Sequence, residues 1–290
     1  MLNYELPQKF ENWIETRNWV LRPHQIEVLN NSKRHSQLLI APTGSGKTLS
    51  GFLPTLIELD SSEFSGLHTI YVSPLKALAS DIKRNLMIPI EEIGLNIRVE
   101  DRTGDTKAAI KRRQRVDPPH ILLTTPESLA LLISFPESKT LFANLKRIVI
   151  DEIHALVESK RGHQLILAIS RLQSLCTNVR KIGLSATVDR PEEIANFISE
   201  NKADCPVIFA KSGINPDISM LQTKTPPPWA GAGANYSIPD VLEKISNHKT
   251  TLIFHNTRAQ AEIFFHNLWL NNKNNLPIAI HHGSLDLEQR

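Results

Sequence analysis

Two short segments of this 290-residue sequence hold residue types that bind nucleotide phosphates and a divalent cation. The first is the run Ala41-Pro42-Thr43-Gly44-Ser45-Gly46-Lys47-Thr48, whose eight residues we expect to bind ATP. It matches the Gly-rich phosphate loop, except that Ala41 stands where the first glycine usually does. Gly44 and Gly46 would let backbone N–H groups close around phosphate oxygens at a helix N-terminus. We expect Lys47 to bridge the β- and γ-phosphates and the Thr48 hydroxyl to bind Mg²⁺.

A pair of adjacent carboxylates supplies the second half of such a site. Asp151 and Glu152 follow the apolar run Ile148-Val149-Ile150, which predicts a buried strand. We expect Asp151 to hold Mg²⁺ through water, and Glu152 to orient and deprotonate the attacking water. Either segment alone has a simpler interpretation, as a Gly-rich turn that binds nothing or an exposed Asp-Glu turn. A shared ATP–Mg²⁺ site explains both, and it makes Lys47, Asp151 and Glu152 the predicted catalytic residues.

The elements that must position these residues alternate along the chain. Short apolar, β-branched runs predict strands, and a longer segment with helical periodicity follows each of them. The predicted strands are residues 37–41, 68–73, 97–100, 120–124, 147–150 and 181–184. Within residues 162–175, apolar side chains recur at helical spacing along one stripe. The alternation predicts an α/β fold with a parallel sheet that helices cover on both faces.

A change in composition divides the chain. Residues 1–211 form the first predicted domain, and residues 212–237 contain several prolines and glycines with little periodicity, which is typical of a linker. The strand and helix pattern then returns, with strands over 250–254 and 277–281 and a helix over 258–270. We therefore expect residues 238–290 to begin a second α/β domain that the sequence leaves incomplete.

Composition limits the classes of protein without selecting a function. With 41% hydrophobic and 22% charged residues, the chain is an ordinary globular sequence. No apolar run is long enough to span a membrane, and no signal peptide is present, so we expect a cytoplasmic protein. Cys176 and Cys205 lack the spacing of a metal site or disulfide framework. The net charge of +3 permits a nucleic-acid partner but is too small to predict one.

Further motifs place the chain among known proteins. Asp151-Glu152-Ile153-His154, followed by Ser185-Ala186-Thr187, resembles the second and third motifs of superfamily 2 helicases. More matches are Arg22-Pro23-His24-Gln25, Ser73-Pro74-Leu75-Lys76-Ala77-Leu78, Arg102-Thr103-Gly104-Asp105-Thr106, Thr124-Thr125-Pro126-Glu127-Ser128-Leu129 and Thr251-Leu252-Ile253-Phe254-His255-Asn256-Thr257-Arg258. Glu158-Ser159-Lys160-Arg161-Gly162 and His281-His282-Gly283-Ser284-Leu285 are similar to the large helicase-related (Lhr) group. Features near Trp229 and Asn256 resemble its bacterial ligase-associated branch.

The resemblance implies a RecA-like P-loop domain, followed by the start of a second RecA-like domain. It implies an ATP-dependent DNA helicase that moves 3′ to 5′ in a DNA repair context, with a DNA ligase and a nuclease as possible neighbours. Gln25 would read the adenine edge, and Phe10 or Trp19 would stack on the base. The residues expected to couple the ATP state to strand binding are His154, Ser185, Ala186 and Thr187.

The same resemblance implies a set of nucleic-acid contacts, mostly to the sugar-phosphate backbone. The expected residues are Pro74, Lys76, Gly104, Asp105, Thr125, Pro126, Glu127, Thr257, Arg258, His282 and Gly283. Thr125-Pro126 could equally be a strand-ending turn. Residues 107–115 hold five basic side chains, which form either a phosphate-binding patch or the solvated face of a helix. The partner would be single-stranded or duplex DNA, with RNA or a DNA–RNA hybrid as the alternative.

Two other functions remain open at this point. An RNA-directed helicase would use the same backbone contacts, and a small-molecule P-loop kinase or ATP-switched scaffold would use the same phosphate loop. The kinase leaves the Ser185-Ala186-Thr187 and 124–129 segments unexplained. Similar helicases continue well past position 290 and carry a later arginine that reaches the γ-phosphate. We therefore expect this chain by itself to bind ATP–Mg²⁺ weakly and not to unwind duplexes.

Overall fold

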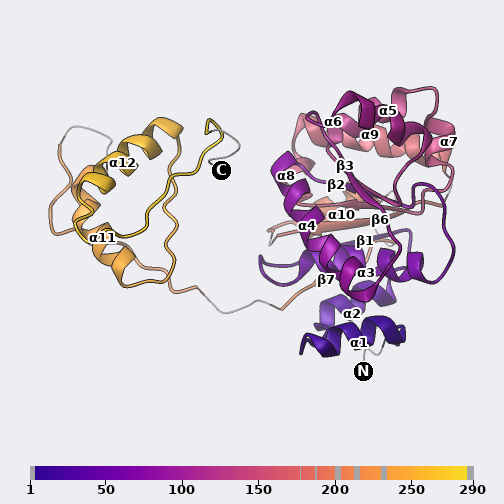
Figure 1. The fold of residues 1–290 in the computed structure, drawn as a ribbon, viewed down its shortest axis with the longest axis horizontal. Coiled ribbons are helices and arrows are strands. Elements are labelled where there is room, and N and C mark those ends of the chain that lie inside the picture. Colours follow the sequence, from indigo (N-terminus) through magenta and orange to yellow (C-terminus); the bar gives the residue numbers. More distant parts are fainter. Residues whose placement is uncertain are drawn as a thin grey trace. The chain divides into compact units, whose positions relative to one another are not determined.

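Seven parallel strands form one sheet in the order β3-β4-β2-β5-β6-β1-β7 in the computed structural model of the protein (Figure 1). They are β1 (Ser36–Ile40), β2 (Thr69–Val72), β3 (Val99–Arg102), β4 (Ile121–Thr124), β5 (Arg147–Ile150), β6 (Arg180–Ser185) and β7 (Val207–Phe209). The structure describes residues 4–176, 178–186, 188–199, 204–211, 216–229 and 234–285, and only the backbone of residues 76–80. The six predicted strands are confirmed; β7 was not predicted.

Alternate side chains of the strands enter two separate apolar cores, as a parallel sheet covered on both faces requires. In β1, Leu38 and Ile40 belong to one core, whereas Leu39 belongs to the other. The Leu39 face is covered by α1 (Gln8–Thr16), α2 (Pro23–Asn30), α3 (Lys47–Asp60) and α4 (Lys76–Ile93). Their side chains in this core include Phe10, Val28, Phe52 and Leu86, in that order. The predicted RecA-like α/β fold is confirmed.

The opposite face is covered by a second group of helices. They are α6 (Pro126–Ser134), α7 (Ser138–Phe142), α8 (His154–Val157), α9 (Lys160–Leu175) and α10 (Pro191–Ile198), with α5 (Ala108–Val116) beside α7. The stripe predicted within residues 162–175 faces this core, where Leu165, Ile169 and Leu172 are buried. No helix in the described part of the chain is long and apolar enough to cross a bilayer.

A buried charge cluster joins the amino ends of the strands. Arg147, whose side chain is fully buried at the start of β5, places Nη2 2.7 Å from Oε1 of Glu58 in α3. Arg180, at the start of β6, contacts the same carboxylate at 2.6 Å and 2.7 Å. Burial alone would raise the pKa of Glu58, but hydrogen bonds from His68 and Arg180 and the two guanidinium charges hold it well below its usual range. This cluster fixes the edge of the sheet opposite the candidate site.

Residues 216–290 form a second compact unit, separate from residues 1–215. It contains a short 3₁₀ helix (Ala234–Ser237), α11 (Ile238–Ser246) and α12 (Arg258–Leu270), which share a small core around Ile238, Phe264 and Leu268. The helix predicted over 258–270 is confirmed as α12. The strands predicted over 250–254 and 277–281 are wrong for the described residues, because neither segment has a hydrogen-bonded neighbouring strand. The apolar run is instead exposed, with Phe254 87% accessible.

Candidate ATP and nucleic-acid site

The carboxyl ends of the strands carry the predicted site residues of the first unit, apart from Gln25. Because all seven strands are parallel, these ends meet at one edge of the sheet. The predicted ATP and coupling residues follow β1, β5 and β6, which are adjacent in the sheet. The predicted nucleic-acid contacts follow β2, β3 and β4, which are also adjacent. Strand order therefore puts the residues expected to bind ATP on one half of this edge (the ATP half) and those expected to contact a nucleic-acid strand on the other (the strand half).

The phosphate loop joins β1 to α3 and has the backbone conformation that its glycines allow. Gly44 and Gly46 have φ values of 78° and 80°, in the left-handed region that other residues rarely adopt. Helix α3 begins at Lys47, directly after the loop. The free N–H groups of its first turn and the positive end of the helix dipole therefore face the position where phosphate oxygens are expected.

Arg22, the N-cap of α2, and two residues of that helix hold the loop through three successive backbone carbonyls. The contacts are Arg22 Nη1 to the Gly44 carbonyl (3.2 Å), His24 Nε2 to the Ser45 carbonyl (3.1 Å) and Gln25 Nε2 to the Gly46 carbonyl (3.4 Å). Burial holds the pKa of His24 below its ordinary value, so the ring is neutral near pH 7 and donates from Nε2. Tying back these carbonyls keeps their oxygens away from an anion bound in the loop. Of these three residues, only Gln25 was predicted to bind the nucleotide, since the motif gives no local sign of the contacts from Arg22 and His24.

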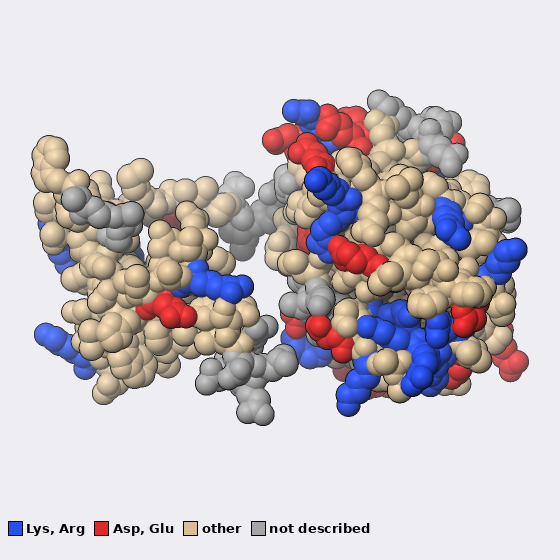
Figure 2. All heavy atoms as spheres, turned by 90° about the horizontal axis from the view of Figure 1, so that it is seen from above, with Lys and Arg blue, Asp and Glu red and all other residues tan. Residues whose placement is uncertain are grey.

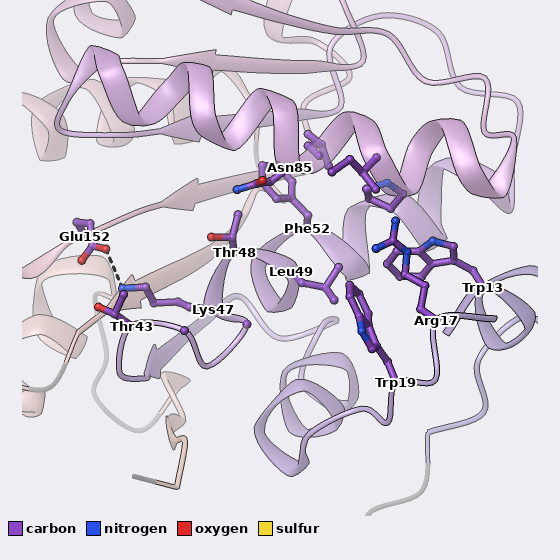
Figure 3. Close-up of a pocket in the computed structure, with 15 residues that line it drawn as sticks. Trp13, Arg17, Trp19, Thr43, Lys47, Thr48, Leu49, Phe52, Asn85 and Glu152 are labelled. Atoms are coloured by element: carbon purple, nitrogen blue, oxygen red, sulfur yellow. Dashed lines mark hydrogen bonds and ion pairs between the residues drawn. The ribbon is translucent and has the colours of Figure 1, made fainter. Parts of the chain in front are cut away.

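Lys47 and Glu152 meet across the edge although they lie 105 positions apart. Lys47 Nζ lies 2.8 Å from Glu152 Oε1, with 10% of the Lys47 side chain and 30% of the Glu152 side chain exposed (Figure 3). Glu152 has a φ of 43°, which for a residue with a Cβ costs about 1–2 kcal/mol. Such backbone strain is typical of functional sites. The geometry places the lysine expected to bind phosphate beside the expected general base.

Asp151 lies deeper, with 5% of its surface exposed. Its Oδ1 accepts a hydrogen bond from the Glu152 N–H at 2.9 Å. Burial raises the pKa of Asp151, and the neighbouring Glu152 charge adds to that rise. The hydroxyl of buried Tyr71 lies against this carboxyl without a hydrogen bond of ordinary geometry, and burial raises the pKa of that phenol. A divalent cation would offset the cost of burying the Asp151 charge.

The donor set suits Mg²⁺ rather than a metal held by the protein alone. Thr48 and Asp151 offer a hydroxyl and a carboxylate, and no group of three His, Cys, Asp or Glu side chains that could hold a metal ion occurs among the described residues. Mg²⁺ commonly binds through one or two protein oxygens, with water and substrate phosphates completing its shell. The residues present therefore fit an ATP-bound Mg²⁺.

His154 connects the carboxylate pair to the end of β6. Its Nδ1 lies 3.2 Å from Ser185 Oγ and 3.4 Å from the Ala186 nitrogen. The Ala186 N–H donates to Nδ1, so that nitrogen is an acceptor and the 3.5 Å approach of Glu152 Oε2 is not a hydrogen bond to it. The structure thus brings together three of the four predicted coupling residues. Thr187 lies outside the described residues.

A pocket of about 410 Å³ lies beside the phosphate loop. Aromatic side chains form one of its walls (Figure 3). Trp19 is 47% exposed and packs edge-on against Trp13. The Arg17 guanidinium lies 5.0 Å from the Trp19 ring centre. Trp19 also lines a neighbouring pocket that contains Gln25. Of the two aromatic residues considered for base stacking, Trp19 is accessible, whereas Phe10 is fully buried in the core, and its assignment was wrong.

The predicted strand contacts of the first unit differ in accessibility. Pro74 and Thr125 are buried, and the Thr125 hydroxyl caps α6 by accepting from the Ser128 nitrogen at 3.4 Å. Gly104 and Asp105 are exposed in the turn after β3. The remaining two, Pro126 and Glu127, begin α6, where Glu127 pairs with Arg161. The side chain of Lys76 lies outside the described part of the chain.

Most of the basic residues in and beside α5 have partners within the protein. Arg113 Nη2 lies 2.5 Å from Glu100 Oε2, Arg115 stacks over Phe135, and Lys111 Nζ donates to the Gly104 carbonyl. These contacts support a solvated helix face for much of the segment. Figure 2 shows Lys and Arg side chains gathered on the face of the first unit that carries α5 in Figure 1. A phosphate-binding patch would depend on exposed Lys107 and Arg112.

The four predicted contacts of the second unit lie close together. Thr257 caps α12 through the Gln260 nitrogen at 3.2 Å. Arg258, the first residue of the helix, reaches the Ser284 hydroxyl beside Gly283. His282 Nε2 lies 2.9 Å from Glu262 Oε1. Within this unit, the arrangement places a guanidinium and an imidazole near one turn.

Comparison with known proteins shows the family to which the chain belongs. A family model described as DEAD/DEAH box helicase matches residues 22–195, which include α2, the phosphate loop and the segments after β2 to β6. The chain belongs to the DEAD/DEAH box helicase family. It is 37% identical to the ATP-dependent helicase Lhr-Core protein 2 of Thermococcus barophilus, over 92% of this chain and 34% of that protein. It is 39% identical to the Lhr helicase/probable uracil glycosylase of Mycolicibacterium smegmatis, over 86% of this chain and 18% of that protein.

A solved helicase structure shares the fold. The Mycobacterium smegmatis helicase Lhr bound to ssDNA and AMP-PNP superimposes with a TM-score of 0.84 and 32% identity, covering 98% of this chain and 39% of that one. The predicted resemblance to the Lhr group is confirmed, whereas the ligase-associated branch stays a prediction. The chain spans about a third of the length of the first helicase relatives, 34%, 36% and 33%.

Proposed function

We propose that this chain is the ATP-binding motor portion of an ATP-dependent DNA helicase that moves 3′ to 5′. The main support is the strand order, which puts the residues expected to bind ATP, after β1, β5 and β6, on one half of a sheet edge and the expected strand contacts, after β2, β3 and β4, on the other. An ATPase that must respond to a nucleic-acid strand needs the two ligands on one rigid edge, since coupling travels through shared packed elements.

At the ATP half, each side chain has a distinct task. Lys47 binds the β- and γ-phosphates, while the loop N–H groups surround them. Thr48 and Asp151 hold Mg²⁺, which neutralises phosphate charge when bound. Glu152 orients the attacking water and accepts its proton. Gln25 reads the adenine edge, and Trp19 stacks on the base.

The coupling between ligands runs through the segment after β5. His154 contacts Ser185 and the Ala186 backbone at the end of β6, so a shift of Glu152 on phosphate binding would reach the end of a second strand. We assign Thr187 to the same relay. The expected strand contacts are Gly104, Asp105, Thr125, Pro126 and Glu127, with Pro74 and Lys76, and Thr257, Arg258, His282 and Gly283 in the second unit.

The direct test is ATP hydrolysis by the complete protein with and without single-stranded DNA. We expect stimulation by the strand in the unmodified protein and no hydrolysis above background in Lys47→Ala. Equal rates with and without DNA in the unmodified protein would contradict a motor function.

DNA is the proposed strand because the Lhr structure is described as bound to ssDNA. The backbone contacts do not by themselves separate ribose from deoxyribose. Unwinding of matched DNA, RNA and hybrid duplexes by the complete protein distinguishes the alternatives, and a strong preference for RNA would overturn the DNA assignment. Membership of the helicase family removes the small-molecule kinase alternative.

The cellular setting follows only from the resemblance. We propose action in the cytoplasm, in DNA repair, with a DNA ligase and a nuclease as neighbours. Affinity capture from cells under conditions that preserve DNA-independent contacts tests this part of the proposal. Recovery of neither enzyme would leave the motor function intact and remove the ligase-associated assignment.

A further inference from the structure

The turn between α8 and α9 is built to fix one arginine at the functional edge. Ser159 caps α9 by accepting from the Gly162 nitrogen at 3.1 Å, and its hydroxyl donates to the Leu156 carbonyl at 2.8 Å. A Cβ at Gly162 would lie 1.9 Å from the same Leu156 oxygen, a distance that no side chain can adopt. The glycine therefore allows α9 to begin directly against α8. Arg161, between the cap and the glycine, is held at a defined place.

Arg161 is bound along one edge of its guanidinium by a carboxylate on a different helix. Its Nε donates to Glu127 Oε1, and its Nη2 donates to Glu127 Oε2 at 3.2 Å. This hydrogen bonding lowers the pKa of Glu127 to about 2, so the carboxylate is charged at neutral pH. No protein partner for Nη1 is found among the described residues, and 41% of the Arg161 side chain is exposed. A guanidinium fixed on one side can donate two parallel bonds from the other.

The position of the pair points to the strand half of the edge. Glu127 lies in the first turn of α6, directly after β4. Arg161 follows the segment after β5, which carries Asp151 and Glu152. A charged carboxylate repels phosphate, and the Thr125 hydroxyl is buried as the cap of α6. Of the side chains at this place, the arginine is therefore the one suited to a phosphate.

We propose that Arg161 binds a phosphate of the nucleic-acid strand and that Glu127 is its positioning residue. The proposal rests on the proposed function, since it names one contact of the strand site. Arg161 would give a role to the Glu158–Gly162 segment, which resembles the Lhr group in sequence. Glu127, which the resemblance made a direct strand contact, would instead orient the Arg161 side chain.

The test uses the complete protein and a matched control. Arg98 donates both ends of its guanidinium to Asp117 at 2.8 Å and 2.6 Å, with 42% of its side chain exposed, but it precedes β3 at the opposite edge. Affinity for fluorescent single-stranded DNA is measured over a range of salt for the unmodified protein, Arg161→Gln and Arg98→Gln. We expect Arg161→Gln to weaken binding roughly tenfold and to reduce the slope of log K against log salt by about 0.7, the value for one single-strand phosphate. Arg98→Gln should match the unmodified protein.

Two further variants separate phosphate contact from a purely structural ion pair. Arg161→Lys should retain the salt slope, because the cation remains, while losing part of the affinity. Glu127→Gln should weaken binding in the unmodified background and have little effect in Arg161→Gln. The inference would be overturned if Arg161→Gln and the unmodified protein had the same slope of log K against log salt and the variant differed only by a lower melting temperature. Failure of the unmodified protein to bind any strand would instead overturn the proposed function.

Discussion

The contact between Lys47 and Glu152 leads to a prediction that separates nucleotide binding from hydrolysis. In Glu152→Gln the ion pair is lost, although glutamine keeps the shape of the side chain and the left-handed backbone. The pair is 2.8 Å long and partly exposed, so its net contribution is about 0.5–1 kcal/mol. Glu152 competes with phosphate for Lys47, and Glu152→Gln should therefore bind ATP–Mg²⁺ as tightly as the unmodified protein or up to about fivefold more tightly.

Hydrolysis should respond in the opposite sense. Glutamine cannot accept the proton of the attacking water, and loss of a general base reduces the rate by about 10²–10⁴. Lys47→Ala should instead weaken ATP–Mg²⁺ binding by roughly 10- to 150-fold, because a charged hydrogen bond contributes about 1.5–3 kcal/mol. The assays are titration with a fluorescent ATP analogue and single-turnover hydrolysis, both on the complete protein with single-stranded DNA.

Hydrolysis and nucleotide binding have different refuting results. Hydrolysis by Glu152→Gln at the unmodified rate would show that Glu152 is not the base. Binding by Glu152→Gln as weak as that by Lys47→Ala would show that the ion pair supports the nucleotide site rather than competing with phosphate.

Three further predictions concern the packing and buried groups at the two edges of the sheet. Gly162→Ala should lower the free energy of unfolding by about 1–3 kcal/mol because its methyl group would overlap the Leu156 carbonyl, and urea unfolding measures the change. Burial holds the pKa of His24 below its ordinary value, so below about pH 6.5 the unfolded chain takes up the proton that the folded chain excludes. The melting temperature should therefore fall as pH drops through that range, and His24→Gln should remove part of the fall; no difference from the unmodified protein would contradict the burial argument. Glu58→Ala should cost about 3–5 kcal/mol in urea unfolding, because it leaves the buried Arg147 charge unpaired, and a loss below about 1 kcal/mol would show that water reaches this cluster.

Local patterns predicted the elements of the first unit well. Strands such as residues 147–150 are continuous apolar runs, because a parallel sheet buries both faces. The edge strand β7 was missed because only Val207–Phe209 pair with β1 and Phe209 is 60% exposed. In the second unit the apolar run 250–254 was wrongly predicted as a strand. Composition gives β propensity, but a strand also needs a hydrogen-bonded neighbour.

The candidate site was predictable in its residues and not in its contacts. The phosphate loop and the carboxylate pair follow predicted strands, so their presence at one edge follows from a parallel sheet. Pairs such as Lys47–Glu152 and Glu127–Arg161 join positions 105 and 34 residues apart, and strand order decides that they meet. The left-handed backbone of Glu152 also has no local sequence signal.

ATP and a nucleic-acid strand are proposed to bind one edge of the sheet and to affect each other's affinity. The most direct measurement is the affinity of the complete protein for single-stranded DNA with and without a non-hydrolysable ATP analogue, together with its affinity for the analogue with and without DNA. Linkage requires the two ratios to be equal, and coupling of this kind usually changes affinity by about 5- to 150-fold. We predict equal ratios of at least about fivefold. Strand affinity that is the same with and without the analogue would contradict the account.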